Sequence, residues 1–449
     1  MRQARRKNNR WYGWAIGLLV ILVGAGGFGA WQLGAMSRKA AAPNALRSAI
    51  KTAKTKHSDG HAVTVKGKGG TVVYLLPRNQ TQPSAALRTQ AQAALPASGR
   101  QRTVVASVAA TNGPMGLTAL RATFTGYSIV HDQLRVTKHA AKGVGVVDAG
   151  GHAATIANLV PDDYTRRAVN YAAKQVLVEQ HKQTPDTLAQ VLAMPLLASM
   201  TATNFHLDKS ALGITDAAGK TLVSVPLSRI APYLRDGGAT ATSGKVVALT
   251  FDDGPNPTTT PKVLKALADA QVKATFFMVG TGLRDFPTTA KAVAAAGHEV
   301  GIHTYDHKFL PGLSHAEAMD EIYGKMTQVY YDVFGKLPTL LRPPYGAISK
   351  PIADAEDLPA IQWTTDSQDW ESRNATAILN RVSATTYDGG IVLMHDIQPA
   401  TVQALPNVLR ALKAKGYRFV TVSELLGGRL LPGHQYFGRG DERLVSNAK

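Results

Sequence analysis

Acidic, histidine and arginine side chains that could perform chemistry recur at five places in the second half of this sequence. They stand at residues 250–255, 303–307, 342–346, 366–370 and 393–395. The first segment carries two adjacent carboxylates before a Gly-Pro turn, which can direct them to different tasks. The second carries two histidines four residues apart, which can reach one ion. Two histidines and one carboxylate are a recurrent ligand set for catalytic zinc with an open position, and the set also suits cobalt, manganese or iron.

Each segment lies at the end of a predicted strand, and helical stretches separate the strands. The strands are expected at residues 246–251, 274–279, 299–304, 339–342, 360–365, 390–395 and 417–422. Between them run stripes of helical period, such as Val263, Leu264, Leu267 and Ala270. Strands that alternate with helices predict a parallel α/β arrangement, and seven repeats within residues 244–430 predict a distorted (β/α)7-type barrel. In such barrels the catalytic residues lie at the C-terminal ends of the strands.

The joint pattern is more specific than any of its parts. An isolated Asp-Asp-Gly-Pro is most often only a turn, and an isolated His-x-x-x-His indicates a metal only weakly. With all five segments, and with the intervening KATFFMVG and GHEVGIH, residues 244–426 resemble the NodB-type polysaccharide deacetylases, carbohydrate esterase family 4. The resemblance implies a metal-dependent hydrolase that removes acetyl groups from a polysaccharide.

The resemblance also implies roles for individual residues. Asp253, His303 and His307 are expected to bind a divalent metal, most simply zinc, with cobalt or manganese as alternatives. The metal would polarise the acetamide carbonyl and lower the pKa of bound water. Asp252 is implied as the general base on that water, and His395 as the general acid that protonates the leaving amine.

Five further positions complete the implied site. By the family pattern, Arg342 braces the base, and Asp369 belongs to the polar network behind base and acid. The backbone N–H of Tyr345 would hold the oxyanion of the tetrahedral intermediate. Trp370 and Leu393 would line the pocket around the sugar ring and the acetyl methyl group.

The architecture as a whole is similar to membrane-anchored peptidoglycan N-acetylglucosamine deacetylases of Gram-positive bacteria, so peptidoglycan is the expected substrate. A chitin-like or poly-N-acetylglucosamine exopolysaccharide is an alternative substrate. O-deacetylation of xylan is another, because it shares the motifs. A non-enzymatic wall-binding module is the remaining alternative, and the intact pair Asp252 and His395 argues against it.

The N-terminal residues predict a membrane anchor. Residues 1–10 carry five basic and no acidic side chains, and residues 11–37 carry no charge. About 20 apolar residues span a bilayer core, and aromatic residues near both ends, such as Trp11 and Trp31, favour the headgroup level. We expect a single-pass protein of the cell membrane with a cytoplasmic N-terminus and an extracellular catalytic domain. A cleaved signal peptide is the alternative.

The remaining chain is divided by its charge. Residues 244–430 hold 18 basic and 19 acidic residues, so the net charge of +19 arises elsewhere. Residues 38–102 are predicted to be a basic stalk, 103–243 a small α+β accessory domain, and 431–449 a C-terminal tail. The basic stalk suits an anionic wall polymer or the membrane surface, and no nucleic-acid partner is expected for an exported chain. The lack of cysteine excludes disulfides and thiol catalysis.

Overall fold

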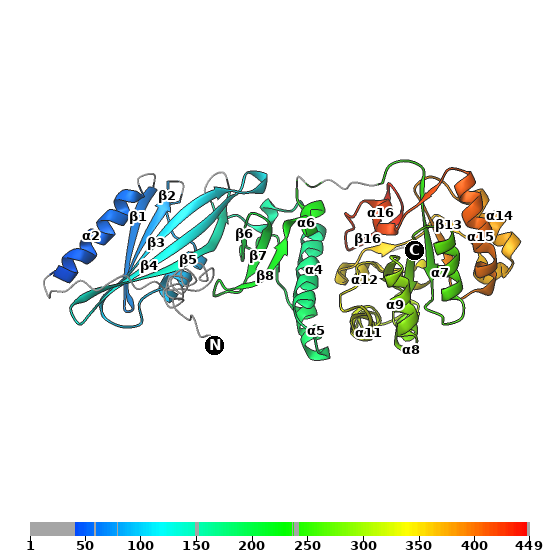
Figure 1. Ribbon diagram of the computed structural model, residues 1–449, viewed down its shortest axis with the longest axis horizontal. Coiled ribbons are helices and arrows are strands. Elements are labelled where there is room, and N and C mark those ends of the chain that lie inside the picture. Colours follow the sequence, from blue (N-terminus) through cyan, green and yellow to red (C-terminus); the bar gives the residue numbers. More distant parts are fainter. Residues whose placement is uncertain are drawn as a thin grey trace, which may run out of the picture. The chain divides into compact units, whose positions relative to one another are not determined.

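The chain divides into two compact units (Figure 1) in the computed structural model, which describes residues 41–57, 60–78, 80–148, 152–235, 237 and 242–446. Unit 1 comprises Met1–Ala154 and Thr203–Leu222, and unit 2 comprises Thr155–Ala202 and Val223–Lys449. Each unit is therefore assembled from two separated stretches of sequence. The predicted anchor at residues 11–37 lies outside the described residues. Within the described ranges, no helix is both long and apolar enough to cross a membrane.

The described part of unit 1 is built on a five-stranded sheet, in the order β1-β2-β3-β4-β5. Its strands are β1 Gly60–Gly67, β2 Gly70–Pro77, β3 Arg100–Asn112, β4 Thr118–Val130 and β5 Gln133–Val147. Side chains alternate along β2, as the pleat of a strand requires. Val72 faces the core that contains residues of α3 (Ala85–Ala93), whereas Val73 faces the core that contains residues of α2 (Ala41–Lys56). The two helices therefore cover opposite faces of the sheet.

The region predicted to be a stalk, residues 38–102, instead supplies α2, β1, β2 and α3 to this sheet. Strands β1 and β2 form an antiparallel hairpin, with Gly67 paired to Gly70. However, β2 also pairs in parallel with β3. This pairing crosses the predicted boundary at residue 102 between the stalk and the accessory domain. Such long-range pairing, and not composition, makes this basic stretch part of a folded unit.

A second, three-stranded sheet follows in the order β6-β7-β8. Its strands are β6 Phe205–Leu207, β7 Ala211–Thr215 and β8 Thr221–Pro226, and α6 spans Leu227–Ile230. A turn at residues 216–219, in which the Gly219 N–H donates to the Asp216 carbonyl at 3.0 Å, connects β7 to β8. The accessory domain predicted at residues 103–243 is not one body, because residues 155–202 and those from Val223 onward belong to unit 2.

A curled mixed sheet forms the centre of unit 2, in the order β11-β10-β9-β14-β16-β12. Parallel bridges from Ile302 to Leu341 and from Leu341 to Ala360 link β11 at one edge to β12 at the other. The short strands β13, β15 and β17 pair with β14, β9 and β16. The bounds are β9 Val246–Asp252, β10 Thr275–Met278, β11 Glu299–Ile302, β12 Ala360–Ile361, β13 Thr365–Asp366, β14 Gly390–His395, β15 Arg418–Phe419, β16 His434–Gly438 and β17 Asp441–Leu444.

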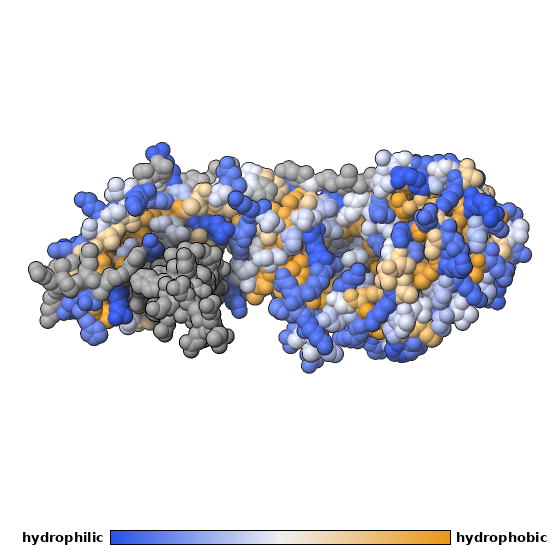
Figure 2. Space-filling model, in the orientation of Figure 1, coloured by the Kyte–Doolittle hydropathy of each residue, from blue (hydrophilic) through white to orange (hydrophobic). Residues whose placement is uncertain are grey.

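Helices lie around this sheet (Figure 1), and their visible outer faces are mostly hydrophilic with scattered hydrophobic residues (Figure 2). The first, α7, buries Val263 and Leu267 of the predicted apolar stripe. The helices are α7 Thr260–Asp269, α8 Gly280–Asp285, α9 Pro287–Ala295, α10 His315–Met319, α11 Lys325–Phe334, α12 Lys350–Ala355, α13 Asp369–Ser372, α14 Ala375–Thr385, α15 Pro399–Ala414 and α16 Val422–Leu426.

The predicted barrel is confirmed in part, as a mixed α/β fold with a curled sheet. The predicted strand at residues 339–342 is only the isolated bridge at Leu341. Residues 431–449, predicted to be a tail, instead provide β16 and β17, and β16 stands between β14 and β12 in the sheet. Tyr436 of β16 is buried in the core. These antiparallel additions make the sheet mixed rather than purely parallel.

A helical pair from the first stretch of unit 2 packs on the barrel. Its helices are α4 Asp163–Gln180 and α5 Pro185–Ala193, and Asp162 caps α4 by accepting a hydrogen bond from the Thr165 N–H at 2.8 Å. The buried Tyr171 of α4 and Leu188 of α5 belong to the same hydrophobic core as strands β9 and β10. The helical pair is therefore part of the hydrophobic core of unit 2.

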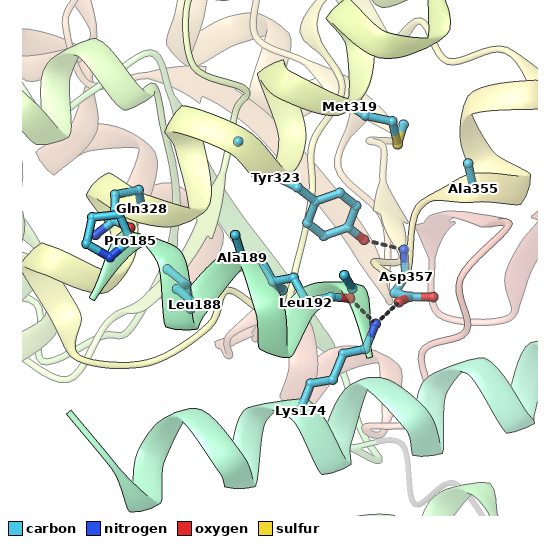
Figure 3. A pocket seen from close by; sticks show the side chains of 12 residues that line it. Lys174, Pro185, Leu188, Ala189, Leu192, Met319, Tyr323, Gln328, Ala355 and Asp357 are labelled. Atoms are coloured by element: carbon cyan, nitrogen blue, oxygen red, sulfur yellow. Dashed lines mark hydrogen bonds and ion pairs between the residues drawn. The ribbon is translucent and has the colours of Figure 1, made fainter. Parts of the chain in front are cut away.

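Polar contacts fix the same helical pair beside a hollow of about 420 Å³. The Lys174 ammonium group lies 2.6 Å from the Leu192 carbonyl and 3.4 Å from the Asp357 carboxylate (Figure 3). The Tyr171 hydroxyl donates to the Pro338 carbonyl at 3.0 Å, and Arg167 donates to the Glu356 carbonyl. A buried lysine needs such partners, because an unpaired buried charge is costly.

Candidate active site

The reactive side chains of unit 2 meet at the C-terminal ends of its parallel strands. Asp252 ends β9 and His395 ends β14, and these two residues are direct partners across neighbouring parallel strands. His303 follows β11, and Arg342 follows the bridging residue Leu341. The strand order therefore brings together segments that lie up to 143 residues apart in the sequence (Asp252 to His395).

Left-handed backbone conformations are concentrated around this site. The non-glycine residues concerned are Asp253 (φ 72°), Thr304 (φ 60°), His307 (φ 59°), Tyr345 (φ 60°) and Gln368 (φ 53°). This conformation costs a non-glycine residue about 1–2 kcal/mol, so surrounding contacts must hold it in place. Strain of this kind clusters at functional sites. Here the strained residues lie in the loops that follow the strands and carry the reactive side chains.

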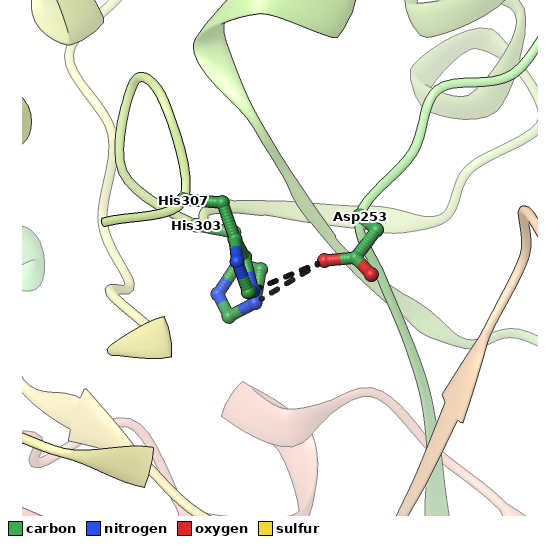
Figure 4. A group of neighbouring side chains, drawn as sticks. All are labelled: Asp253, His303 and His307. Carbon is green, nitrogen blue, oxygen red and sulfur yellow. Dashed lines mark ion pairs between the residues drawn. The ribbon is translucent and has the colours of Figure 1, made fainter. Parts of the chain in front are cut away.

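Asp253, His303 and His307 form a candidate metal site (Figure 4). Each offers one ligand atom, and these atoms all lie within 4.8 Å of one another. The Asp253 Oδ1 atom is 3.6 Å from His303 Nε2 and 3.4 Å from His307 Nε2. It is buried and has no hydrogen-bond partner among the described residues. A cation bound among the three side chains would satisfy this buried oxygen.

His303 is held in a form that suits a ligand. Its Nδ1 lies 2.7 Å from the Arg342 carbonyl, which can only accept, so Nδ1 carries the proton and Nε2 is free to coordinate. Burial lowers the pKa of His303 to about 3, and the ring is therefore neutral at physiological pH. A hydrogen bond from the second ring nitrogen is usual for metal-ligating histidines. The residues present thus fit a divalent cation.

Asp252 lies next to this set and is held by Arg342. Its Oδ1 accepts from Arg342 Nη1 at 2.8 Å, and both side chains are buried. Burial raises the pKa of Asp252, whereas the charge of Arg342 opposes the rise. Arg342 also donates to Thr250 Oγ1 at 2.6 Å, to the Ile361 carbonyl at 3.1 Å and to the Gln362 carbonyl at 3.0 Å. This network fixes the carboxylate in one orientation.

His395 is paired with Asp369. The two are joined by a 2.7 Å contact between His395 Nδ1 and Asp369 Oδ1. The second carboxylate oxygen accepts from the His395 backbone N–H at 2.7 Å and from the Thr401 hydroxyl. Burial lowers the pKa of His395, but the hydrogen bond and charge of Asp369 outweigh burial and raise it to about 9. His395 is therefore protonated at neutral pH.

Aromatic side chains flank the site and remain exposed. The exposed fractions are 67% for Tyr345, 49% for Trp370 and 52% for Phe309. The Tyr345 ring lies 4.8 Å from the His307 ring and 6.2 Å from the Phe309 ring, measured between centroids. Leu393, by contrast, is buried on β14. Exposed rings beside a polar site are suited to contact the apolar faces of sugars.

Three polar residues of the site escaped the sequence prediction. Thr250 and Thr401 anchor Arg342 and Asp369, and nothing in a lone threonine signals such a role. Asp396 directly follows His395 and is buried, and it accepts a hydrogen bond from the Thr260 hydroxyl. A Cβ at Gly254 would come within 2.4 Å of the Asp396 carboxylate, which explains the glycine of the first segment.

Comparison with known proteins shows which family this chain resembles. A family model described as polysaccharide deacetylase matches residues 239–360. The peptidoglycan-N-acetylglucosamine deacetylase PgdA of Listeria monocytogenes is 44% identical over 205 residues, which cover 46% of this chain and 44% of that protein. The chain thus spans less than half the length of this relative.

Two Bacillus proteins are also similar. The peptidoglycan-N-acetylmuramic acid deacetylase PdaC of Bacillus subtilis is 38% identical over 181 residues, covering 40% of this chain and 38% of that protein. A peptidoglycan-N-acetylglucosamine deacetylase of Bacillus cereus is 39% identical over 191 residues, covering 40% of this chain and 88% of that protein. With nearly all of this last relative matched, and with the acidic, histidine and arginine side chains gathered at one edge of the sheet, the chain belongs to the polysaccharide deacetylase family.

Proposed function

We propose that this protein hydrolyses the N-acetyl groups of N-acetylglucosamine residues in peptidoglycan and releases acetate. The observation that carries the proposal is the pairing of Asp252 with His395 across β9 and β14, beside the Asp253, His303 and His307 cluster. The names of the Listeria and Bacillus cereus relatives favour peptidoglycan and its glucosamine unit.

The metal that we propose is zinc, held by Asp253, His303 and His307, and the same donors would accept cobalt or manganese. A divalent cation there supplies Lewis acidity toward the acetamide group. The neutral His303 ring and the buried Asp253 oxygen, which has no hydrogen-bond partner among the described residues, are the features that support this placement.

Asp252 is proposed as the general base that takes a proton from the attacking water. Its carboxylate is oriented by Arg342, and its pKa is raised by burial. A base with a raised pKa accepts a proton more readily, provided that it is ionised at the working pH. Activity should therefore rise as the pH rises through the pKa of this group.

His395 is proposed as the general acid that gives its proton to the leaving amine. The Asp369 carboxylate holds its Nδ1 proton, so that Nε2 is the nitrogen left to donate. The backbone N–H of Tyr345 is proposed to stabilise the oxyanion, with Trp370 and Leu393 around the sugar and acetyl group. Arg342 and Asp369 act through the groups that they position.

Replacing Asp369 by asparagine should move the basic limb of the pH–rate profile to lower pH. The acid works only when protonated, so wild-type activity should fall as the pH rises through about 9, the pKa of His395. Asparagine removes the negative charge that raises this pKa, and the limb should shift downward. The measurement is kcat/KM against pH for both proteins. An unchanged limb would contradict His395 as the acid.

The proposed reaction can be tested on three substrates in parallel. Intact peptidoglycan, N-acetylated chitooligosaccharides and acetylated xylan should be incubated with the protein, and released acetate and new free amines measured separately. The proposal expects acetate and amine in equal amounts from peptidoglycan. Faster turnover of chitooligosaccharides, or acetate from xylan without amine, would favour the alternative substrates. A lack of release from all three would refute an enzymatic role.

Replacing His303 by alanine should abolish both metal retention and acetate release. The variant loses one of the three proposed ligands. In the wild type, chelation of the metal should remove activity, and addition of zinc or cobalt should restore it. Metal content can be measured by atomic emission without any assay of turnover. His315→Ala, which alters an exposed histidine of the same unit, is the control. Retention of one metal per chain by the His303 variant would refute the ligand assignment.

A further inference from the structure

Unit 1 carries nearly all of the positive charge of the described chain. Its described residues include 16 Lys and Arg against 4 Asp and no Glu, a net charge of +12, whereas those of unit 2 include 26 basic and 25 acidic residues. The four aspartates are used locally: Asp208, for example, lies 2.6 Å from Arg121. The surplus in unit 1 therefore faces solvent without internal compensation. A charge of this size on one unit points to an anionic partner.

A groove runs over one face of the unit 1 sheet. It consists of two adjoining hollows of about 540 Å³ and 520 Å³, which share Gln90, Gly143, His206 and Gly219. The Gln90 side chain donates to the Gly143 carbonyl at 3.1 Å and thereby joins α3 to β5 at the floor. Helix α2 covers the opposite face of the sheet, so the groove is separate from it.

The two hollows differ in chemistry. The first is lined by the cationic Arg121, Lys142 and Lys220 and by His139, with Asp208 as its acidic residue. The second is lined by amide and hydroxyl side chains such as those of Gln82 and Ser84, by the carboxylate of Asp216, and by apolar side chains such as Val144. In the described part of the chain, neither Lys142 nor Lys220 has an ion-pair partner for its ammonium group, and both side chains are exposed.

The side chain of His206 lines both hollows and lies where they adjoin. Its ring fits between Gly143 and Gly213, where an added Cβ would come within 2.6 Å and 2.1 Å of ring atoms. The residue is only 8% exposed, and its buried Nδ1 has no hydrogen-bond partner within the described ranges. A buried polar atom left without a partner is unfavourable. A ligand that brings a hydroxyl or an anionic oxygen into the groove would relieve it.

The geometry points to this groove as a binding site for a linear phosphodiester-linked polyol chain, whose phosphates would meet Lys142 and Lys220 while its hydroxyls occupy the second hollow. Alternating phosphates and hydroxyls match a cationic hollow beside one that offers amide, hydroxyl and carboxylate groups for hydrogen bonds. The two phenylalanines that line the groove, Phe124 and Phe205, are both buried. Nucleic acids are usually held by exposed stacking rings, and a flat bilayer does not enter a groove.

The test compares two charge-reversal pairs in the full-length protein. Lys142→Glu with Lys220→Glu alters the groove, and Lys51→Glu with Lys54→Glu makes the same change in net charge on exposed positions of α2, on the other face of the sheet. Each protein, in neutral detergent micelles, is titrated into fluorescently labelled linear poly(glycerol phosphate), and anisotropy is recorded at several salt concentrations. Circular dichroism confirms that each variant is folded.

The groove pair should lose about tenfold or more in affinity, because charge-assisted contacts to phosphate are strong, while the α2 pair should change by less than about twofold. The wild-type affinity should also fall with rising salt. Equal losses in the two pairs would show diffuse attraction and overturn the site. So would a failure of the wild type to bind, tighter binding of single-stranded DNA of equal charge, or displacement of the polymer by micelles doped with anionic lipid.

Discussion

Replacing Asp252 by asparagine should lower the turnover number by about 10²–10⁴-fold, the usual contribution of a general base. Asparagine keeps an oxygen that can accept from Arg342, so the fold should survive. Asp252 is not among the three proposed ligands, and the metal content should therefore stay at the wild-type level. Acetate release under saturating substrate and metal analysis of the same preparation measure the two quantities.

Asp306→Asn is the matched control for this experiment. Asp306 is an exposed carboxylate within the histidine segment, and its replacement should leave turnover near the wild-type value. The losses from Asp252→Asn and His395→Ala should not add fully, because base and acid serve the same tetrahedral intermediate. Near-wild-type acetate release by the Asp252 variant would eliminate the proposed mechanism whatever its metal content.

A chain that begins at Gly244 should fail to fold stably, although it contains all five reactive segments. Such a chain lacks α4 and α5, whose buried Tyr171, Val178, Leu188 and Val191 complete the core of the barrel. Burial of each such side chain contributes about 1.5–3 kcal/mol, and their sum is comparable to a typical net stability of about 5–15 kcal/mol. The lost segment would also leave Asp357 without Lys174.

The control for the truncation is a chain in which residues 155–202 are joined by a flexible linker to residues 223–446. This chain should remain soluble and unfold cooperatively near the wild-type melting temperature. Tyr171→Ala in the full-length protein should cost about 3–5 kcal/mol, the usual range for a large buried side chain. A Gly244 chain that melts at the wild-type temperature would show that the helical pair is dispensable.

The sequence was informative wherever local patterns suffice. The strand that ends at Asp252 is apolar except for Thr250 and Asp252 and is fully buried, so it could be located from residue types alone. The candidate site could be assembled because each reactive segment lies at or just after the end of a predicted strand, and parallel strands present the same end to one edge.

The remaining features depend on contacts that no local pattern encodes. Val72 lies in a basic stretch of sequence, and only the pairing of its strand, β2, with β3 makes β2 an internal strand of the sheet. Tyr436 lies near the C-terminus, where antiparallel pairing of β16 with β14 brings it into the core. No local pattern in α4 predicts that this helix packs against a barrel whose first strand, β9, begins at Val246.

The interleaving of the two units has a consequence for the order in which the chain is made. Synthesis delivers α4 and α5 before the strands that bury them, and the closing strands of unit 1 follow after these helices. From Ala193 at the end of α5 to Met278 at the end of β10 are 85 residues, or roughly 4–17 s at ~5–20 residues per second. Limited proteolysis of stalled nascent chains should cut α4 at these lengths and spare it in longer ones. For this interval α4 has only α5 to cover its apolar stripe, because the strands that complete the core are not yet made, and apolar surface exposed in this way favours aggregation of the nascent chain.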